Sequence, residues 1–106
     1  MTAYFIAHGT LKDAEKMQRY VALSGPIMAR HGGEWISTGE VKKVLTGSHV
    51  HARVAIFRFP STAHVEAWYN DPDYQKLWDF RKECGDFDFL AVEEFPWVED
   101  AKKAQE

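Results

Sequence analysis

Residues 52–59, "ARVAIFRF", decide the fold, because this short run is apolar on both of its faces. Strict alternation sets Val54 and Ile56 on one face and Phe57 and Phe59 on the other, which is the period of a β-strand. A strand of this kind must be covered from both sides. The sheet that contains this strand therefore needs a cover on each of its faces.

Three further segments have strand character. Residues 3–8, "AYFIAH", and 86–95, "DFDFLAVEEF", are also apolar on both faces. Residues 34–46, "EWISTGEVKKVLT", predict a strand bent at Gly39, where a β-bulge is the usual role of a glycine. We expect a loop around "GSHVH" to connect this strand to the one at 52–59.

Two helical regions separate these strands. The first follows Asp13, and its inward positions recur at helical spacing: Met17, Val21, Ser24, Met28 and His31. Gly25-Pro26 predicts a kink or two abutting segments, because proline lacks a backbone donor, and Gly32-Gly33 ends the region.

The second helical region begins with Ser61 as its N-cap and stops near Asn70. Asp71 and Pro72 then restart a helix, as a cap followed by proline at the first helical position. Together with the strands, this order predicts an α+β, ferredoxin-like βαββαβ domain with a four-stranded antiparallel sheet.

Both helical regions of such a domain lie on one face of the sheet. The other face would expose a patch larger than monomers normally tolerate. We therefore expect a homodimer, in which two sheets pack face to face as a dimeric α+β barrel. Residues 1–95 would form the single domain, and residues 96–106 a polar C-terminal tail in which Trp97 packs against the partner or the sheet edge.

Bulk composition excludes two classes of partner. The 106 residues carry a net charge of -3 and no basic run, so nucleic acid is not an expected partner. No apolar segment approaches the roughly 20 residues that a membrane helix requires, so a membrane is not an expected partner either. With Cys84 as the single cysteine, we expect a cytoplasmic protein without an internal disulfide.

Four stretches together resemble the family catalogued as domain of unknown function 1330: "AYFIAH", "RHGGEW", "RVAIFRFPS" and "AWYNDPDYQKLWDFR". The resemblance spans about residues 3–94, and it implies the dimeric α+β barrel superfamily, which includes cofactor-free monooxygenases, muconolactone isomerases and haem-binding proteins similar to chlorite dismutase. It implies no single activity. Two departures from the family pattern are Arg58, often acidic in the family, and the ending "VEEFPW".

The stretch that begins at Pro72 contains the main candidate site. Tyr74, Leu77, Trp78 and Arg81 have the spacing of one helical face, which points the arginine toward the sheet. An unpaired buried guanidinium costs several kcal/mol, so Arg81 needs a partner. One interpretation is a structural pair with Glu93 or Asp88, or a solvated head on a packed stem.

The functional interpretation makes Arg81 an anchor for the carboxylate of a small ligand. Aromatic walls suit such a ligand, and the candidate substrate-binding residues are Arg81, Trp68, Tyr69, Trp78, Trp35 and Arg53. Candidate proton-transfer residues are His31, Tyr20 and His8. The alternative for His31 is a structural role, in which its side chain interacts with the helix C-terminus. The alternative for His8 is a solvent-exposed side chain.

The pair His49 and His51 has the alternation of two metal ligands, and His64 could join them. The spacing is common by chance and no acidic or cysteine ligand is near, so we expect neither metal nor haem, and no cofactor. The function that follows is a small-molecule-binding domain, either a cofactor-independent isomerase, hydrolase or oxygenase of small organic acids or lactones, or a non-catalytic binding module.

Overall fold

The computed structural model describes residues 1–105, and it has the βαββαβ order that the sequence predicts. The elements are β1 (Ala3–Leu11), α1 (Ala14–Arg30), β2 (Glu34–Glu40), β3 (Arg53–Phe59), α2 (Thr62–Tyr69), α3 (Pro72–Gln75), α4 (Trp78–Cys84), β4 (Gly85–Glu93) and α5 (Val98–Ala104). The four strands form one antiparallel sheet in the order β2-β3-β1-β4. The fold class is α+β and ferredoxin-like, as expected.

Helices α1, α2 and α3 begin where a side chain can satisfy one of their first backbone N–H groups. Asp13 accepts a hydrogen bond from the backbone of Lys16 at 3.0 Å. Ser61 accepts one from the backbone of His64 at 3.2 Å, and Asp71 caps α3. The predicted caps Ser61 and Asp71 are thus confirmed.

Helix α1 runs unbroken from Ala14 to Arg30 with Pro26 inside it, so the prediction of two abutting segments is wrong. The turns on both sides of Pro26 stay helical, and Ser24 and Met28 are both buried, so packing holds the helix together there. Gly32 then has a φ of 81°, a conformation that favours glycine. A Cβ atom on Gly33 would collide with Met28 and Phe59, so this close approach also requires glycine.

The core lies between the sheet and the helices, and it is largely aromatic. Phe5 of β1 packs on Trp68 of α2, with ring centroids 4.8 Å apart. Trp68 packs in turn on Tyr74 of α3 at 4.4 Å. Phe59, Trp68 and Tyr74 are almost completely buried. Large aromatic side chains from the sheet, α2 and α3 therefore form much of this core.

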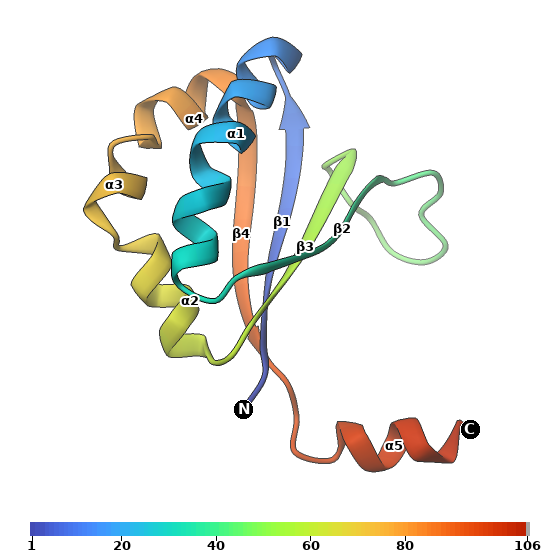
Figure 1. Ribbon diagram of the computed structural model, residues 1–106. Coiled ribbons are helices and arrows are strands. Elements are labelled where there is room, and N and C mark those ends of the chain that lie inside the picture. Colours follow the sequence, from blue (N-terminus) through green and yellow to red (C-terminus); the bar gives the residue numbers. More distant parts are fainter. Residues whose placement is uncertain (106) are drawn as a thin grey trace.

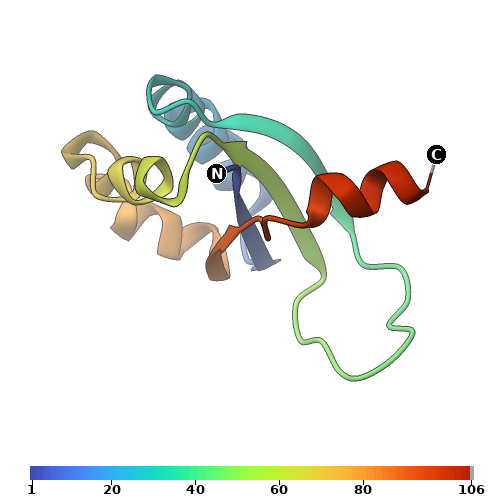
Figure 2. The same cartoon turned by 90° about the horizontal axis from the view of Figure 1, so that it is seen from below.

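The opposite face of the sheet, which we call the open face, is not covered by any helix of residues 1–105 (Figure 1). Register and alternation place Tyr4, Ile6, Ile56, Leu90 and Val92 on it. Leu90 and Val92 are 49% and 39% exposed. Figures 1 and 2 show the loop of residues 41–52 and helix α5 projecting away from the sheet. Helices therefore cover one face only, as the sequence predicts.

Three details differ from the sequence prediction. The second strand ends at Glu40 rather than at residue 46, and its register shift lies between Trp35 and Ser37 instead of at Gly39. Residues 41–52 form a loop that pairs only at Val41. The polar tail contains helix α5, which has no buried residue.

The stretch from Pro72 to Cys84 is also not one helix. It forms α3 and α4, separated at Lys76 and Leu77. Leu77 closes α3 by donating its backbone N–H to Tyr74, and it accepts from the backbone of Arg81 at 2.7 Å. The break preserves the predicted face, because Tyr74 and Arg81 still come into contact.

Candidate functional site

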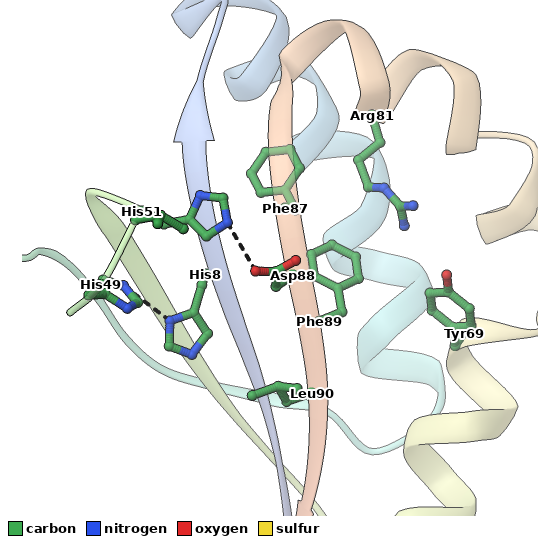
Figure 3. Close-up of a pocket in the computed structure, with 10 residues that line it drawn as sticks. His8, His49, His51, Tyr69, Arg81, Phe87, Asp88, Phe89 and Leu90 are labelled. Atoms are coloured by element: carbon green, nitrogen blue, oxygen red, sulfur yellow. Dashed lines mark hydrogen bonds and ion pairs between the residues drawn. The ribbon is translucent and has the colours of Figure 1, made fainter. Parts of the chain in front are cut away.

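A hollow of about 520 Å³ follows the edge strand β4 (Figure 3). Its lining residues are His8, His49, Val50, His51, Tyr69, Arg81, Phe87, Asp88, Phe89 and Leu90. Because successive side chains of a strand point to opposite faces, Phe87 and Phe89 face the helices, whereas Asp88 and Leu90 lie on the open face. The hollow therefore has two sides separated by the β4 backbone, which we call the helix side and the histidine side.

Arg81 is the central residue of the helix side. It lies on α4, partly buried, and its Nη1 donates a hydrogen bond to Tyr74 Oη at 3.0 Å. Its Cζ atom lies 4.7 Å from the ring centroid of Phe89 and 5.7 Å from that of Trp78. The charge is thus held by a neutral hydroxyl and two aromatic faces.

The structural pairing considered for Arg81 does not form among residues 1–105. No carboxylate oxygen in that range lies within 4 Å of its guanidinium. Asp88 points to the histidine side and contacts His51 instead. Glu93 ends β4, opposite Ala3, far along the strand from Phe87. The guanidinium therefore has no ionic partner among residues 1–105.

Tyr20 and Tyr74 support Arg81 from the core. Their hydroxyl oxygens are 2.6 Å apart, and both residues are buried. Burial raises the pKa of Tyr20 far above its usual range and also raises the pKa of Tyr74. Both phenols are neutral hydrogen-bonding groups, and Tyr74 connects Tyr20 to the guanidinium.

Aromatic rings form the wall beside Arg81. Tyr69 lies 5.4 Å from Trp78 between ring centroids, and Trp68 lies behind Tyr69 at 6.0 Å. The indole N–H groups of Trp68 and Trp78 are buried and have no hydrogen-bond partner among residues 1–105. Leaving a buried donor unpaired costs about 1–3 kcal/mol.

The histidine side gathers three imidazoles from β1 and the 41–52 loop. His8 Nδ1 lies 3.4 Å from His49 Nε2, and His51 Nε2 lies 3.1 Å from Asp88 Oδ2. His51 Nδ1 lies 2.9 Å from Thr10 Oγ1. Within residues 1–105, no group of three or more histidine, cysteine, aspartate or glutamate side chains is arranged to hold a metal ion. His64 is away from this cluster, hydrogen-bonded to Ser61.

His31 is not part of the hollow. It caps the C-terminus of α1, and its Nε2 lies 2.7 Å from Asp71 Oδ2, a contact that lowers the pKa of the Asp71 carboxyl. It stands eleven positions beyond Tyr20, about 16 Å along the helix. The structure therefore separates His31 from Tyr20, and places His8 on the other side of the sheet from both Tyr20 and Arg81.

Of the six predicted substrate-binding residues, Arg81 and Tyr69 line the hollow, whereas Trp68, Trp78, Trp35 and Arg53 do not. Trp35 is 60% exposed on β2 and donates its indole N–H to Thr38 at 2.7 Å. Arg53 begins β3 and is exposed. Sequence reasoning missed Thr10, Phe87 and Phe89 as site residues; the alternation in "DFDFLAV" carries a signal for the two phenylalanines, whereas nothing in the sequence marks Thr10.

The chain belongs to the family described as Domain of unknown function (DUF1330), which matches residues 2–104. No curated protein matches it. No helix within residues 1–105 is long and apolar enough to cross a membrane. The family agrees with the resemblance that the sequence suggests, and its name assigns no activity.

Several solved structures share the fold. A protein of unknown function from Rhodopseudomonas palustris, RPA0582, is 21% identical with a TM-score of 0.74 over 89% of this chain and 82% of that one. SnoaB, a cofactor-independent oxygenase from Streptomyces nogalater, is 10% identical with a TM-score of 0.65 over 89% and 93%. A dimeric ferredoxin-like protein of unknown function from Thermobifida fusca YX is 10% identical with a TM-score of 0.59 over 89% and 92%.

Proposed function

We propose that this protein binds a small organic acid or lactone on the helix side of the hollow, with Arg81 holding a carboxylate or carbonyl oxygen of the ligand. The observation that carries the proposal is the partly buried guanidinium with no carboxylate within 4 Å among residues 1–105. A guanidinium in a low-dielectric setting gains most from an anionic oxygen acceptor. In this proposal the ligand supplies the negative charge that residues 1–105 do not place beside Arg81.

The surroundings of Arg81 support a mostly apolar ligand. Tyr69, Phe87 and Phe89 line this side of the hollow, and Trp78 packs beside Tyr69. Aromatic walls with one charged anchor are typical of sites for small aromatic or short-chain acids. Trp68 lies behind this wall, where it fixes Tyr69 rather than touching a ligand.

A non-catalytic binding function is the alternative to an enzyme at this side. Neither an imidazole nor a carboxylate is among its lining residues within 1–105, and Tyr20 and Tyr74 are neutral and buried. Such a site can hold and orient an acid but lacks a base of its own. The shared fold with a cofactor-independent oxygenase supports the enzyme hypothesis only by analogy.

We further propose that the protein is a cytoplasmic homodimer that packs open face against open face. The uncovered apolar face and the dimeric relative of the same fold support this assembly. A reducing compartment suits the single buried thiol, Cys84.

Calorimetric titration with benzoate tests the ligand proposal. We expect the wild type to bind benzoate, and Arg81→Met to bind it about tenfold more weakly or worse, because a charge-assisted hydrogen bond is lost. Arg30→Met is the matched control, since Arg30 is an exposed arginine that pairs with Asp71 and Asp73 away from the hollow. Equal affinity of wild type and Arg81→Met would contradict the anchor role.

A further inference from the structure

The histidine side contains a chain of three hydrogen-bonding groups that the proposed function does not use. Thr10 Oγ1 lies 2.9 Å from His51 Nδ1, and His51 Nε2 lies 3.1 Å from Asp88 Oδ2. The three residues come from β1, the 41–52 loop and β4. A hydroxyl, an imidazole and a carboxylate thus stand in line, although they are far apart in sequence.

The order of these groups determines the direction of each hydrogen bond. A carboxylate only accepts, so His51 Nε2–H donates to Asp88. In the neutral imidazole the other nitrogen, Nδ1, is then an acceptor, and the Thr10 hydroxyl donates to it. The basic nitrogen of His51, Nδ1, therefore accepts the hydrogen bond from the Thr10 hydroxyl. A general base and the nucleophile that it activates are related in this way.

The setting keeps the imidazole sheltered and the hydroxyl accessible. The His51 side chain is only 12% exposed, whereas Thr10 is exposed and Asp88 is 68% exposed. The apolar residues Val50 and Leu90 are also among the lining residues of the hollow. A short acyl chain could lie on that lining with its carbonyl group near Thr10.

Thr10 lies close to the end of the sheet. It is the second-last residue of β1 and pairs with Asp86 near the start of β4. The apolar centre of the open face, around Ile6 and Ile56, lies further along the strands. A partner packed on that centre would leave the Thr10 end at the rim of the interface.

We propose that Thr10, His51 and Asp88 form a nucleophile, base and orienting carboxylate that transfer the acyl group of small esters or lactones to water. We call these three residues the relay. This activity is separate from ligand binding at Arg81, because β4 lies between the two sides and none of the three residues is hydrogen-bonded or ion-paired to Arg81.

The two chemical steps follow from the geometry. Thr10 Oγ1 bonds to the carbonyl carbon of the ester as its proton passes to His51 Nδ1, and Asp88 stabilises the imidazolium. The bond from the carbonyl carbon to the alcohol oxygen then breaks, and the alcohol leaves with the proton from His51. Water attacks the acyl-threonine by the same route, which releases the acid and restores the Thr10 hydroxyl.

Hydrolysis of p-nitrophenyl acetate by the full-length protein tests the proposal. We expect a burst of nitrophenolate and, after an acid quench, a peptide acetylated at Thr10 by mass spectrometry. Thr10→Val keeps the β-branched shape and should lose both signals, whereas Thr10→Ser should keep them. His51→Gln should reduce the rate about a hundredfold or more, and Asp88→Asn should reduce it by favouring the wrong tautomer.

The matched control is Asp86→Asn, on the same strand and the same face, where Asp86 pairs with Lys12 outside the relay. Its rate should equal that of the wild type. Acetylation of another residue, or a rate that Thr10→Val does not change while circular dichroism shows a folded protein, would overturn the relay. Benzoate binding to Thr10→Val should be unchanged, so failure of the relay leaves the Arg81 proposal standing, and the reverse also holds.

Discussion

The guanidinium of Arg81 lies over the ring of Phe89, with Cζ 4.7 Å from the ring centroid, on the face of β4 that points to the helices. Phe89 is offset by one residue from Asp88, which the sequence analysis considered as an ion-pair partner of Arg81. That offset of one residue turns the carboxylate to the opposite side of the sheet. The arginine therefore contacts aromatic rings and a hydroxyl, and no carboxylate of residues 1–105 pairs with its charge.

The first prediction concerns the stability of Arg81→Met. Methionine keeps the packing on Phe89, and Tyr74 keeps its hydrogen bond to Tyr20. We expect the free energy of unfolding in urea at neutral pH to stay within about 1 kcal/mol of the wild type, or to rise. Loss of a buried ion pair would instead cost about 3–5 kcal/mol.

Arg19→Met is the control for that measurement, because Arg19 lies 5.4 Å from the ring of Phe80 in a similar cation–π contact but is exposed. A loss of several kcal/mol in Arg81→Met alone would mean that the guanidinium is a structural group, contrary to the anchor role.

The second prediction concerns alkaline pH. Burial raises the pKa of Tyr20 and Tyr74 in the folded protein, whereas tyrosine in the unfolded chain ionises near pH 10. The contribution of these two neutral tyrosines to the free energy of unfolding is fully present below about pH 10, and it is lost as the pH rises toward their folded pKa values. Tyr20→Phe should therefore reduce the slope of this loss by about 1.4 kcal/mol per pH unit.

Urea unfolding of the wild type and Tyr20→Phe at several pH values on both sides of pH 10 measures the two slopes. Lysine ionisation contributes alike to both proteins, so it cancels in the difference. Identical slopes would show that Tyr20 ionises as easily in the folded protein as in the unfolded chain.

The third prediction concerns the C-terminal segment. Phe95 and Trp97 stack with ring centroids 5.4 Å apart, yet they are 64% and 60% exposed, and α5 buries nothing. Such an apolar pair needs a cover, which we expect a second copy to supply. Deleting residues 96–106 should lower the melting temperature by calorimetry, and an unchanged value would mean that the segment is free of the partner.

Much of the fold follows from sequence patterns, for local reasons. Alternation identifies β1 and β3 and both of their faces, and the caps Ser61 and Asp71 mark where helices begin. The errors fall where long-range contacts override local signals. Pro26 does not break α1 because the residues around it pack, and residues 41–46 leave the sheet although their composition suits a strand.

The site is less predictable, because it depends on which face of β4 each residue occupies and on where the 41–52 loop lies. The spacing of Tyr74 and Arg81 predicts that they share a face, and the structure brings them to 3.0 Å. By contrast, the contact of His51 with Thr10 and Asp88 joins segments with about 40 residues between them. No local pattern encodes such a contact.

The last prediction tests the dimer. Ile56 lies near the centre of the open face, paired with Ile6 on one neighbouring strand and Ser37 on the other. In a twofold interface the same residue occurs twice, so Ile56→Lys places two desolvated charges into apolar surface. We expect the wild type at low micromolar concentration to sediment at twice the 12.2 kDa chain mass, and Ile56→Lys to sediment as a folded single chain. Val21→Lys, on the partly exposed surface of α1, is the control that should remain a dimer. A wild type of single-chain mass, or an Ile56→Lys variant that still dimerises, would mean that the open face is not the interface.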